Sequence, residues 1–375
     1  MSSHAFTPST VTPSRIHGLD TLRAVAILLV MMYHYMVFVS NEASFGILSE
    51  VGWIGVDLFF VLSGHLIGDQ ILSELARDGR LRLSRFYGRR ALRTLPNYLF
   101  VLGIYLLFPV QAGGNPTTPL WQFLSFTQNL HLLPGSAFSH AWSLCVEEQF
   151  YFVLPLLALL CLGWCRSVRA MWAVIILTML LCAAMRFVML DRVGADGGLY
   201  RTYIYYPSWG RIDELMPGVA LALIKNFHVQ RWQSCLQRGH FYFGWGVFLS
   251  LLAVVIFQWF SYDIEEGFLW FATTFGYTLL SCGFACLVLS ALSPQSYLSR
   301  WRVLGAEALA LWSYALYLIH KPLMNALLPA FQQRAWDVKQ GGPIAALFII
   351  SILAAGLMYR WLETPFMRLR GRFFP

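Results

Sequence analysis

The segment that decides the fold is RAVAILLVMMYH, residues 23–34, in which ten apolar or nearly apolar residues separate an arginine from a histidine. Eleven steps of 100° and 1.5 Å place Arg23 and His34 on one face of a helix, about 16 Å apart. The segment therefore predicts a membrane helix with two ionisable groups on one interior stripe, at opposite depths. The alternative is that His34 is a satisfied core histidine and Arg23 a snorkelling arginine.

Composition excludes a soluble globular protein. The chain has 375 residues, of which 58% are hydrophobic and 12% charged, whereas soluble domains carry about 25% charge. The net charge of +8 lies in short loops between apolar runs, which indicates membrane orientation rather than nucleic-acid binding. The seven cysteines lie mostly in apolar segments, so we interpret them as packing residues and expect no metal site.

Ten segments are long and apolar enough to be candidate membrane spans, since a span needs about 20 mainly apolar residues. The third and sixth of them are short. We expect an all-α integral membrane protein with one transmembrane domain over residues 1–375, including a polar N-terminal segment (1–18) and a basic tail (364–375). The candidates are 22–40, 51–72, 95–110, 146–164, 170–190, 212–225, 241–260, 268–290, 305–330 and 342–362.

The distribution of basic residues predicts the orientation. If the spans alternate in direction, twenty of the 27 Lys and Arg residues lie on the side of the N-terminus and five on the other side. Segments 41–50, 111–140 and 261–267, all on that other side, contain no Lys or Arg. Cytoplasmic loops carry an excess of basic residues. Both termini are therefore expected to be cytoplasmic.

Ionisable residues recur at one expected depth, in the outer half of the membrane. Polar groups in a bilayer are costly and usually line an interior site. One such residue is easily structural, but convergence from five helices predicts a buried functional site. Besides His34, its members are Asp57, Glu147, His320 and the pair Arg211 and Asp213. Tyr151 shares the stripe of Glu147, and Trp142 fits an interfacial aromatic belt.

A basic segment precedes the third candidate span. Seven arginines lie between Arg77 and Arg93, and Arg90 and Arg93 are spaced i, i+3. Attraction to anionic membrane lipids accounts for part of this charge. Since the forked guanidinium group suits phosphate, a polyphosphate ligand on the cytoplasmic side is the second hypothesis.

These motifs together resemble the membrane-bound acyltransferase-3 family over nearly the whole chain. The motifs occur in the family order: GLD (18–20) before Arg23 and His34, GVDLFFVLSG (55–64), RRALRTLP (89–96), WSLCVEEQFY (142–151), RIDEL (211–215), YLIHKP (317–322) and ETP (363–365). Two departures are His65, where Phe is usual, and Cys145, where Ser is frequent.

The resemblance implies an O-acyltransferase of the bacterial cytoplasmic membrane. Members acylate surface glycans, lipids or small secondary metabolites, so the expected acceptor is a hydroxyl of a cell-envelope glycan or glycolipid. The co-substrate is acyl-CoA, often acetyl-CoA, which docks from the cytoplasm without a tightly bound cofactor. Arg90 and Arg93 become candidates for its phosphates or its pantetheine entrance, and Arg89 is a weaker one.

The favoured mechanism has His34 as general base on the acceptor hydroxyl, since a histidine suits that role near neutral pH. Glu147 or Asp57 would orient the imidazole, and Arg23 would stabilise the thioester oxyanion or bind the CoA arm. An alternative path acylates His34 first. Residues expected to contact the substrate are Arg211, Asp213, His320, Tyr151 and Trp142.

A different class of function stays open from the sequence. The same buried groups would serve as a proton relay in a transporter of a polar metabolite. Transporters often show paired repeats with broken helices in matching positions, and no internal repeat stands out in this sequence. The acyltransferase is therefore the leading hypothesis and the proton-coupled transporter the second.

Overall fold

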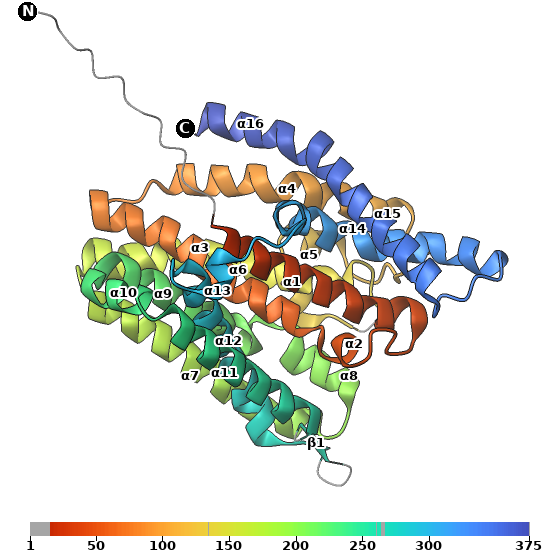
Figure 1. Cartoon of the computed structure of the whole chain (residues 1–375), viewed down its shortest axis with the longest axis horizontal. Coiled ribbons are helices and arrows are strands. Elements are labelled where there is room, and N and C mark those ends of the chain that lie inside the picture. The colour runs from red at the N-terminus through yellow and green to blue at the C-terminus, as the bar shows by residue number, and fades with distance from the viewer. Residues whose placement is uncertain (1–15, 134, 260, 264–266, 375) are drawn as a thin grey trace, which may run out of the picture.

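The computed structural model describes residues 16–133, 135–259, 261–263 and 267–374 and is almost entirely helical there (Figure 1). This confirms the all-α class. Two short antiparallel strands, β1 (Tyr262–Asp263) and β2 (Gly267–Phe268), form the one sheet in the described residues.

Sixteen α-helices follow one another along the described chain. Several are extended by π-helical turns, as at Met36–Ser40 and Tyr359–Glu363. The α-helices are α1 (His17–Tyr35), α2 (Ile47–Val51), α3 (Ile54–Asp78), α4 (Leu83–Leu107), α5 (Leu120–Leu124), α6 (Trp142–Ala158), α7 (Val168–Val193), α8 (Gly197–Tyr200), α9 (Met216–Phe227), α10 (Val229–Leu236), α11 (Gly239–Trp259), α12 (Trp270–Leu292), α13 (Tyr297–Arg300), α14 (Ala306–Gln333), α15 (Gly341–Met358) and α16 (Thr364–Phe373).

Seven helical stretches in the described part of the chain are long and apolar enough to cross a membrane. The predicted count of ten is not confirmed. Helices α4 and α14 are long but fall outside this set, and α9 has 12 residues, or about 18 Å, against a hydrocarbon core of about 30 Å. The seven are His17–Ser40, Ile54–Asp78, Ser139–Trp164, Val168–Val193, Gly239–Trp259, Trp270–Leu292 and Gly341–Phe373.

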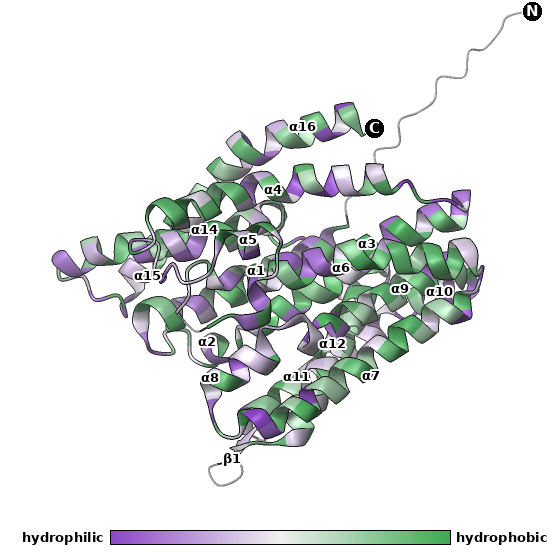
Figure 2. Cartoon of the chain, turned by 180° about the vertical axis from the view of Figure 1, so that it is seen from behind, coloured by the Kyte–Doolittle hydropathy of each residue, from purple (hydrophilic) through white to green (hydrophobic). Residues whose placement is uncertain are grey.

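The outer helices present apolar side chains to their surroundings. Hydrophobic residues predominate along α7 and α11 (Figure 2), and both helices are mostly unburied. Large apolar side chains that are about half exposed include Ile176, Leu177, Leu180 and Leu181 on α7 and Phe248 and Leu251 on α11. Water does not support such a surface, so the chain is a multi-pass membrane protein.

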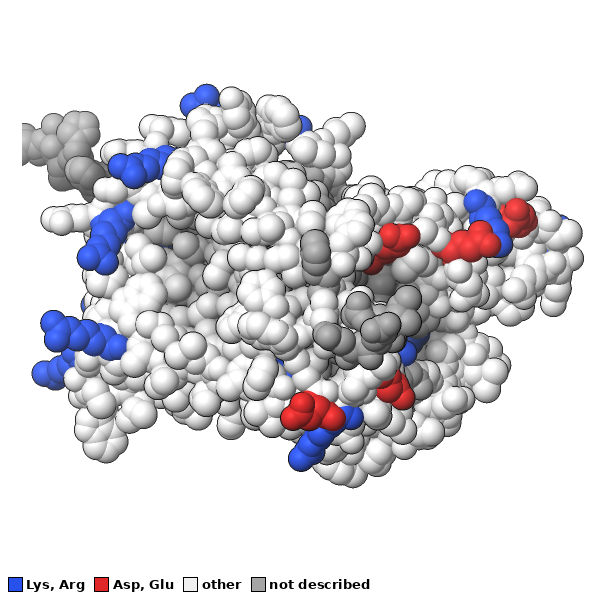
Figure 3. Space-filling model, turned by 90° about the horizontal axis from the view of Figure 1, so that it is seen from below, with Lys and Arg blue, Asp and Glu red and all other residues white. Residues whose placement is uncertain are grey.

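Helix α1 lies at the centre of the bundle and packs against α3, α12 and α14. Helix α16 lies beside α4 (Figure 1), where Arg89 Nη1 donates to the Phe374 carbonyl at 3.5 Å. On the face seen in Figure 3, basic residues gather without acidic neighbours at the left end, and acidic residues appear only toward the other end. The cytoplasmic position of both termini stays a prediction.

Glycines let α3 approach its neighbours closely. A Cβ at Gly55 would lie 2.4 Å from the Ala26 carbonyl oxygen, and one at Gly64 would lie 2.0 Å from the Leu215 carbonyl oxygen. Neither backbone oxygen moves without shifting its own segment. These contacts fix α3 against α1 and against the turn that precedes α9.

Substituting Gly64 by alanine is expected to destabilise the protein by about 1–3 kcal/mol, the usual cost of forcing a methyl group into a packed core. Gly103 of α4 is the matched control, because a Cβ there meets no atom within 4 Å. G103A should leave stability unchanged or raise it. Unfolding in detergent, followed for both variants, checks the difference, and equal stability of the two would contradict the packing argument.

Much of segment 111–140, which was expected in a loop outside the membrane, is buried within the bundle instead. Residues 120–141 carry fully buried side chains such as Asn129 and Phe138. Asn129 Nδ2 donates to Ser208 Oγ at 2.9 Å, which joins this segment to the irregular stretch 201–215. Non-helical backbone is tolerated at membrane depth where protein surrounds it. Helix α6 consequently begins at Trp142, in the interior.

Candidate active site

Three histidines meet at the C-terminal end of α1. His34 of α1 and His320 of α14 are joined by a 2.7 Å hydrogen bond between His34 Nδ1 and His320 Nε2, with rings nearly parallel at 9°. His140, in the 3₁₀ turn before α6, packs edge-on against both rings, with centroids 6.2 and 5.7 Å away. This histidine cluster (His34, His140, His320) brings together two predicted site residues and one that was not predicted.

Polar side chains surround the histidine cluster. Tyr317 Oη donates to the His140 carbonyl at 2.5 Å and is 2.7 Å from Ser143 Oγ. Lys321 Nζ donates to Ser139 Oγ at 2.7 Å, and its side chain is 2% exposed. These contacts hold the 3₁₀ turn against α14, so the position of His140 depends on both elements.

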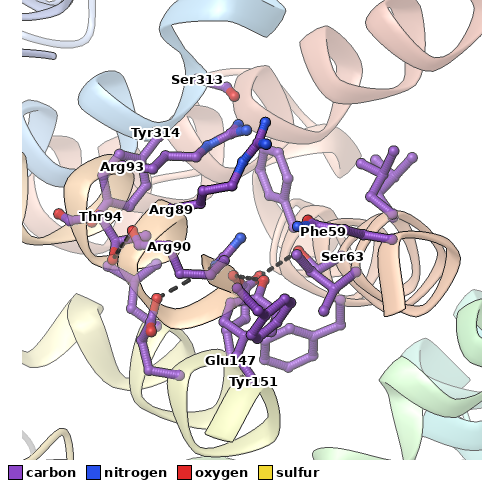
Figure 4. Close-up of a pocket in the computed structure, with 18 of the residues that line it drawn as sticks. Phe59, Ser63, Arg89, Arg90, Arg93, Thr94, Glu147, Tyr151, Ser313 and Tyr314 are labelled. Carbon is purple, nitrogen blue, oxygen red and sulfur yellow. Dashed lines mark hydrogen bonds and ion pairs between the residues drawn. The ribbon is translucent and has the colours of Figure 1, made fainter. Parts of the chain in front are cut away.

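An arginine-rich pocket of about 560 Å³ lies on the Arg23 side of the histidine cluster. Helices α3, α4, α6 and α14 contribute its walls (Figure 4). Arg85 Nε and Arg90 Nε are buried without a hydrogen-bond partner among the described residues. Seven arginines and three carboxylates, Glu74, Glu147 and Glu148, line the pocket. It therefore holds a surplus of positive charge, suited to a polyanion. Its seven arginines are Arg23, Arg77, Arg85, Arg89, Arg90, Arg93 and Arg370.

The arginine pocket reaches the histidine cluster. Ser143 and Tyr317 line its inner end, and the hydroxyl of Tyr317 contacts the backbone of His140. The Tyr317 ring also packs against the rings of His140 and His320, with centroids 5.8 and 6.2 Å away, so Tyr317 lies between the pocket and these imidazoles. An anionic ligand in the pocket would extend its far end toward the cluster.

Glu147 lies in the arginine pocket rather than beside His34. Its carboxylate accepts hydrogen bonds from Ser63 at 3.0 Å and from Tyr151 at 2.7 Å. The Arg90 guanidinium lies 3.6 Å from the centroid of the Tyr151 ring (Figure 4). Glu147 was expected as a partner that orients His34, and here it lines the same pocket as Arg23 instead.

Asp57 also has a different partner from the one expected. Arg211 Nη2 donates to Asp57 Oδ1 at 3.0 Å, and Arg211 pairs in addition with Glu214. No hydrogen bond joins Asp57 or Glu147 to His34 in the described chain. The residue that contacts His34 Nδ1 is His320.

A second buried ion pair lies next to Asp57 and Arg211. Arg186 of α7 binds both carboxylate oxygens of Asp213, at 2.8 and 3.0 Å, and donates to the carbonyls of Thr274 and Gly210. All these side chains are almost fully buried. Arg211 and Asp213 therefore link α3, α7 and α12 to the turn before α9, which is a structural arrangement rather than a contact with the histidine cluster.

Trp142 is buried at 4% exposure and does not belong to an interfacial belt. Its ring packs against Tyr205 and lies 5.1 Å from the guanidinium of Arg211. Packing against the segment 201–215 explains this difference. His65 is also buried, stacked near Trp232, and does not line the arginine pocket.

The sequence did not predict His140, Arg186, Glu214 or Arg370 as residues of these clusters. His140 lies two residues before the motif WSLCVEEQFY, and Glu214 lies within RIDEL. Their polar character in an apolar chain was the available signal. Among the described residues, no group of three or more His, Cys, Asp or Glu side chains is placed to hold a metal ion.

The chain is similar to known proteins over nearly its whole length. YrhL of Bacillus subtilis is 29% identical over 376 residues, covering 93% of this chain and 54% of that protein. The peptidoglycan O-acetyltransferase OatA of Listeria monocytogenes is 27% identical over 381 residues, 93% of this chain and 55% of that protein. The O-acetyltransferase OatA of Staphylococcus aureus is 25% identical over 385 residues, 94% of this chain and 57% of that protein.

The chain thus spans about half the length of these relatives. No solved structure matches it significantly. The family model described as an acyltransferase domain matches residues 16–360, which include the histidine cluster and all but one of the pocket arginines. The chain belongs to this acyltransferase family.

Proposed function

We propose that the protein is a membrane O-acyltransferase that moves an acyl group, typically acetyl, from cytoplasmic acyl-CoA to a hydroxyl of a cell-envelope glycan. The observation that carries the proposal is the arginine pocket that ends at Tyr317, which packs against the histidine cluster. The pocket suits a polyanionic donor, and the cluster supplies a base where the donor would end.

The donor is assigned to the pocket by charge. Acyl-CoA carries its phosphates at one end and its thioester at the other, so the phosphates would bind the guanidinium groups of Arg89, Arg93 and Arg370. Arg23 is about 16 Å from His34 along α1. At that distance it would contact the donor arm rather than an oxyanion formed beside His34.

The chemistry is assigned to His34. The acceptor oxygen attacks the thioester carbonyl carbon while His34 takes the hydroxyl proton, the new C–O bond forms and the C–S bond breaks. His34 then returns the proton to the departing thiolate, which leaves as free CoA. The relatives named as peptidoglycan O-acetyltransferases favour a cell-wall glycan as acceptor, and the bacterial cytoplasmic membrane as the site of reaction.

Purified protein tests this function directly. With acetyl-CoA and a soluble glycan oligosaccharide, free thiol and an ester on the glycan should form in equal amounts. Uptake of a polar metabolite into proteoliposomes, with no dependence on acetyl-CoA and no thiol release, would favour the transporter instead.

Replacing Arg93 by alanine is expected to raise the KM for acetyl-CoA about 10- to 100-fold with kcat nearly unchanged. A hydrogen bond to a charged group contributes about 1.5–3 kcal/mol, and about 1.4 kcal/mol is tenfold in affinity. Arg93 is the choice because Arg90 already binds Glu148 and Tyr151. Steady-state kinetics with acetyl-CoA measures the effect.

Two controls accompany R93A. The exposed Arg231 of α10 lies outside the pocket, so R231A should leave the KM unchanged. Acetyl-pantetheine lacks the nucleotide phosphates, so R93A and wild type should use it equally well. An equal loss with both donors would show that Arg93 does not bind phosphate.

A further inference from the structure

We propose that His320 is a positioning residue that fixes which nitrogen of His34 accepts the proton. The Leu316 backbone carbonyl fixes the orientation of His320 in turn. The inference rests on the proposed function and adds to it a residue and an atom. It starts from two hydrogen bonds: His320 Nδ1 with the Leu316 carbonyl oxygen at 2.8 Å, and His34 Nδ1 with His320 Nε2 at 2.7 Å.

The donor and acceptor roles follow from the carbonyl. A carbonyl oxygen only accepts, so His320 Nδ1 carries a hydrogen and donates it to Leu316. In a neutral imidazole the other nitrogen is then an acceptor, so His320 Nε2 accepts from His34 Nδ1. His34 consequently carries its hydrogen on Nδ1, and its lone pair is on Nε2. That nitrogen has no hydrogen-bond partner within the described residues and is free to take a proton.

The same hydrogen bond also stabilises His34 after it has taken the proton. When His34 Nε2 takes the hydroxyl proton, the Nδ1–H of the imidazolium still points at the lone pair of His320 Nε2, 2.7 Å away. Hydrogen bonds from charged donors are about twice as strong as neutral ones, so the contact strengthens as charge develops. His320 acts here as the acceptor that a carboxylate provides in a Ser-His-Asp triad.

A neutral partner suits this location better than a carboxylate. The His34 and His320 side chains are 8% and 0% exposed, and a buried unpaired carboxylate is costly. The carboxylates that were candidates for this role, Glu147 and Asp57, are bound to Ser63, Tyr151 and Arg211. His320 is therefore the one described side chain hydrogen-bonded to His34.

The other groups at the cluster do not compete for His34 Nδ1. His140 Nε2 is 3.1 Å from the Leu318 carbonyl and donates to it. His140 Nδ1 then carries a lone pair and has no hydrogen-bond partner among the described residues. Lys321, next to His320 in sequence, is bound to Ser139. Both features leave the bond from His34 to His320 as the one that sets the tautomer.

The test compares H320A, H320Q and H65F in full-length protein. H320A should lower kcat by about 10²-fold, the lower end of a base contribution, with the KM for acetyl-CoA unchanged. Gln accepts a hydrogen bond through its side-chain oxygen, so H320Q should recover about tenfold of that loss. H65F replaces a buried histidine outside the site and should match wild type. Equal kcat for H320Q and H320A, or an H320A kcat within threefold of wild type, would overturn the proposal.

A second readout does not depend on turnover or on the folding of H320A. Nitrogen-15 spectra of protein labelled at histidine, with the His34 signals identified by their loss in H34Q, report which ring nitrogen carries the hydrogen. Wild type should show protonated Nδ1 and bare Nε2. The opposite tautomer would overturn the proposal, whereas the absence of thiol release by wild type would count against the acyltransferase function alone.

Discussion

H34A protein is expected to remain folded in the membrane and to lose acyl transfer by about 10²–10⁴-fold in kcat, the range that a general base contributes. The imidazole is the part of His34 that bonds to His320, and truncation leaves the arginine pocket untouched. The KM for acetyl-CoA should therefore stay near its wild-type value. Thiol release from acetyl-CoA in the presence of a glycan acceptor measures both constants.

H65F is the control for the loss of a buried histidine, because His65 is 2% exposed and does not line the pocket. H65F should retain the wild-type kcat. Its thermal stability should equal that of H34A. Acylation by H34A at the wild-type rate would remove His34 from the chemistry. A matching loss in H65F would mean that any buried histidine substitution disturbs the bundle.

R186M should lower the free energy of unfolding by about 3–5 kcal/mol, the cost of removing one partner from a buried ion pair. The substitution removes the charged partner of the buried Asp213 carboxylate, whose oxygens lie 2.8 and 3.0 Å from the guanidinium, and leaves it the hydroxyl of Thr278 as a donor. It also removes the donors to the Thr274 and Gly210 carbonyls. Unfolding in mixed micelles measures the change.

R192M is the matched control on α7, since Arg192 is exposed and its loss should cost under about 0.5 kcal/mol. The double variant R186M/D213L should recover much of the stability, because replacing both members of a buried pair is often nearly neutral. A change below about 1 kcal/mol for R186M would show that this pair does not hold α7 to the turn before α9.

Local features of the sequence predicted the helical class, but not how many helices are long and apolar enough to span a membrane. An apolar run near 20 residues predicts a membrane helix because it is long enough to cross the bilayer. The glycines of α3 allow close approach to neighbouring helices because they have no Cβ. Arg23 and His34 were placed on one stripe correctly, since both lie on an unbroken helix. His34 contacts His320, and Arg23 lines the pocket.

The pairing of the other polar residues was not predictable from spacing. The surroundings of Glu147 depend on how α6 packs, and that depends on the burial of residues 120–141. Asn129 in this segment bonds to the equally irregular segment 201–215. These are long-range contacts between two segments without a helical period. The same folding brings His140 into the cluster and leaves Arg186 and Asp213 to pair away from it.

The most direct test of the central claim is a sided acyl-transfer assay in proteoliposomes of known protein orientation. Labelled acetyl-CoA is supplied to one face and a glycan acceptor to the other. We predict labelled ester on the glycan only when acetyl-CoA is on the face where the arginine pocket opens, with loss of the signal in H34A. Equal transfer from either face, or acetyl-CoA-independent movement of a solute, would contradict the account.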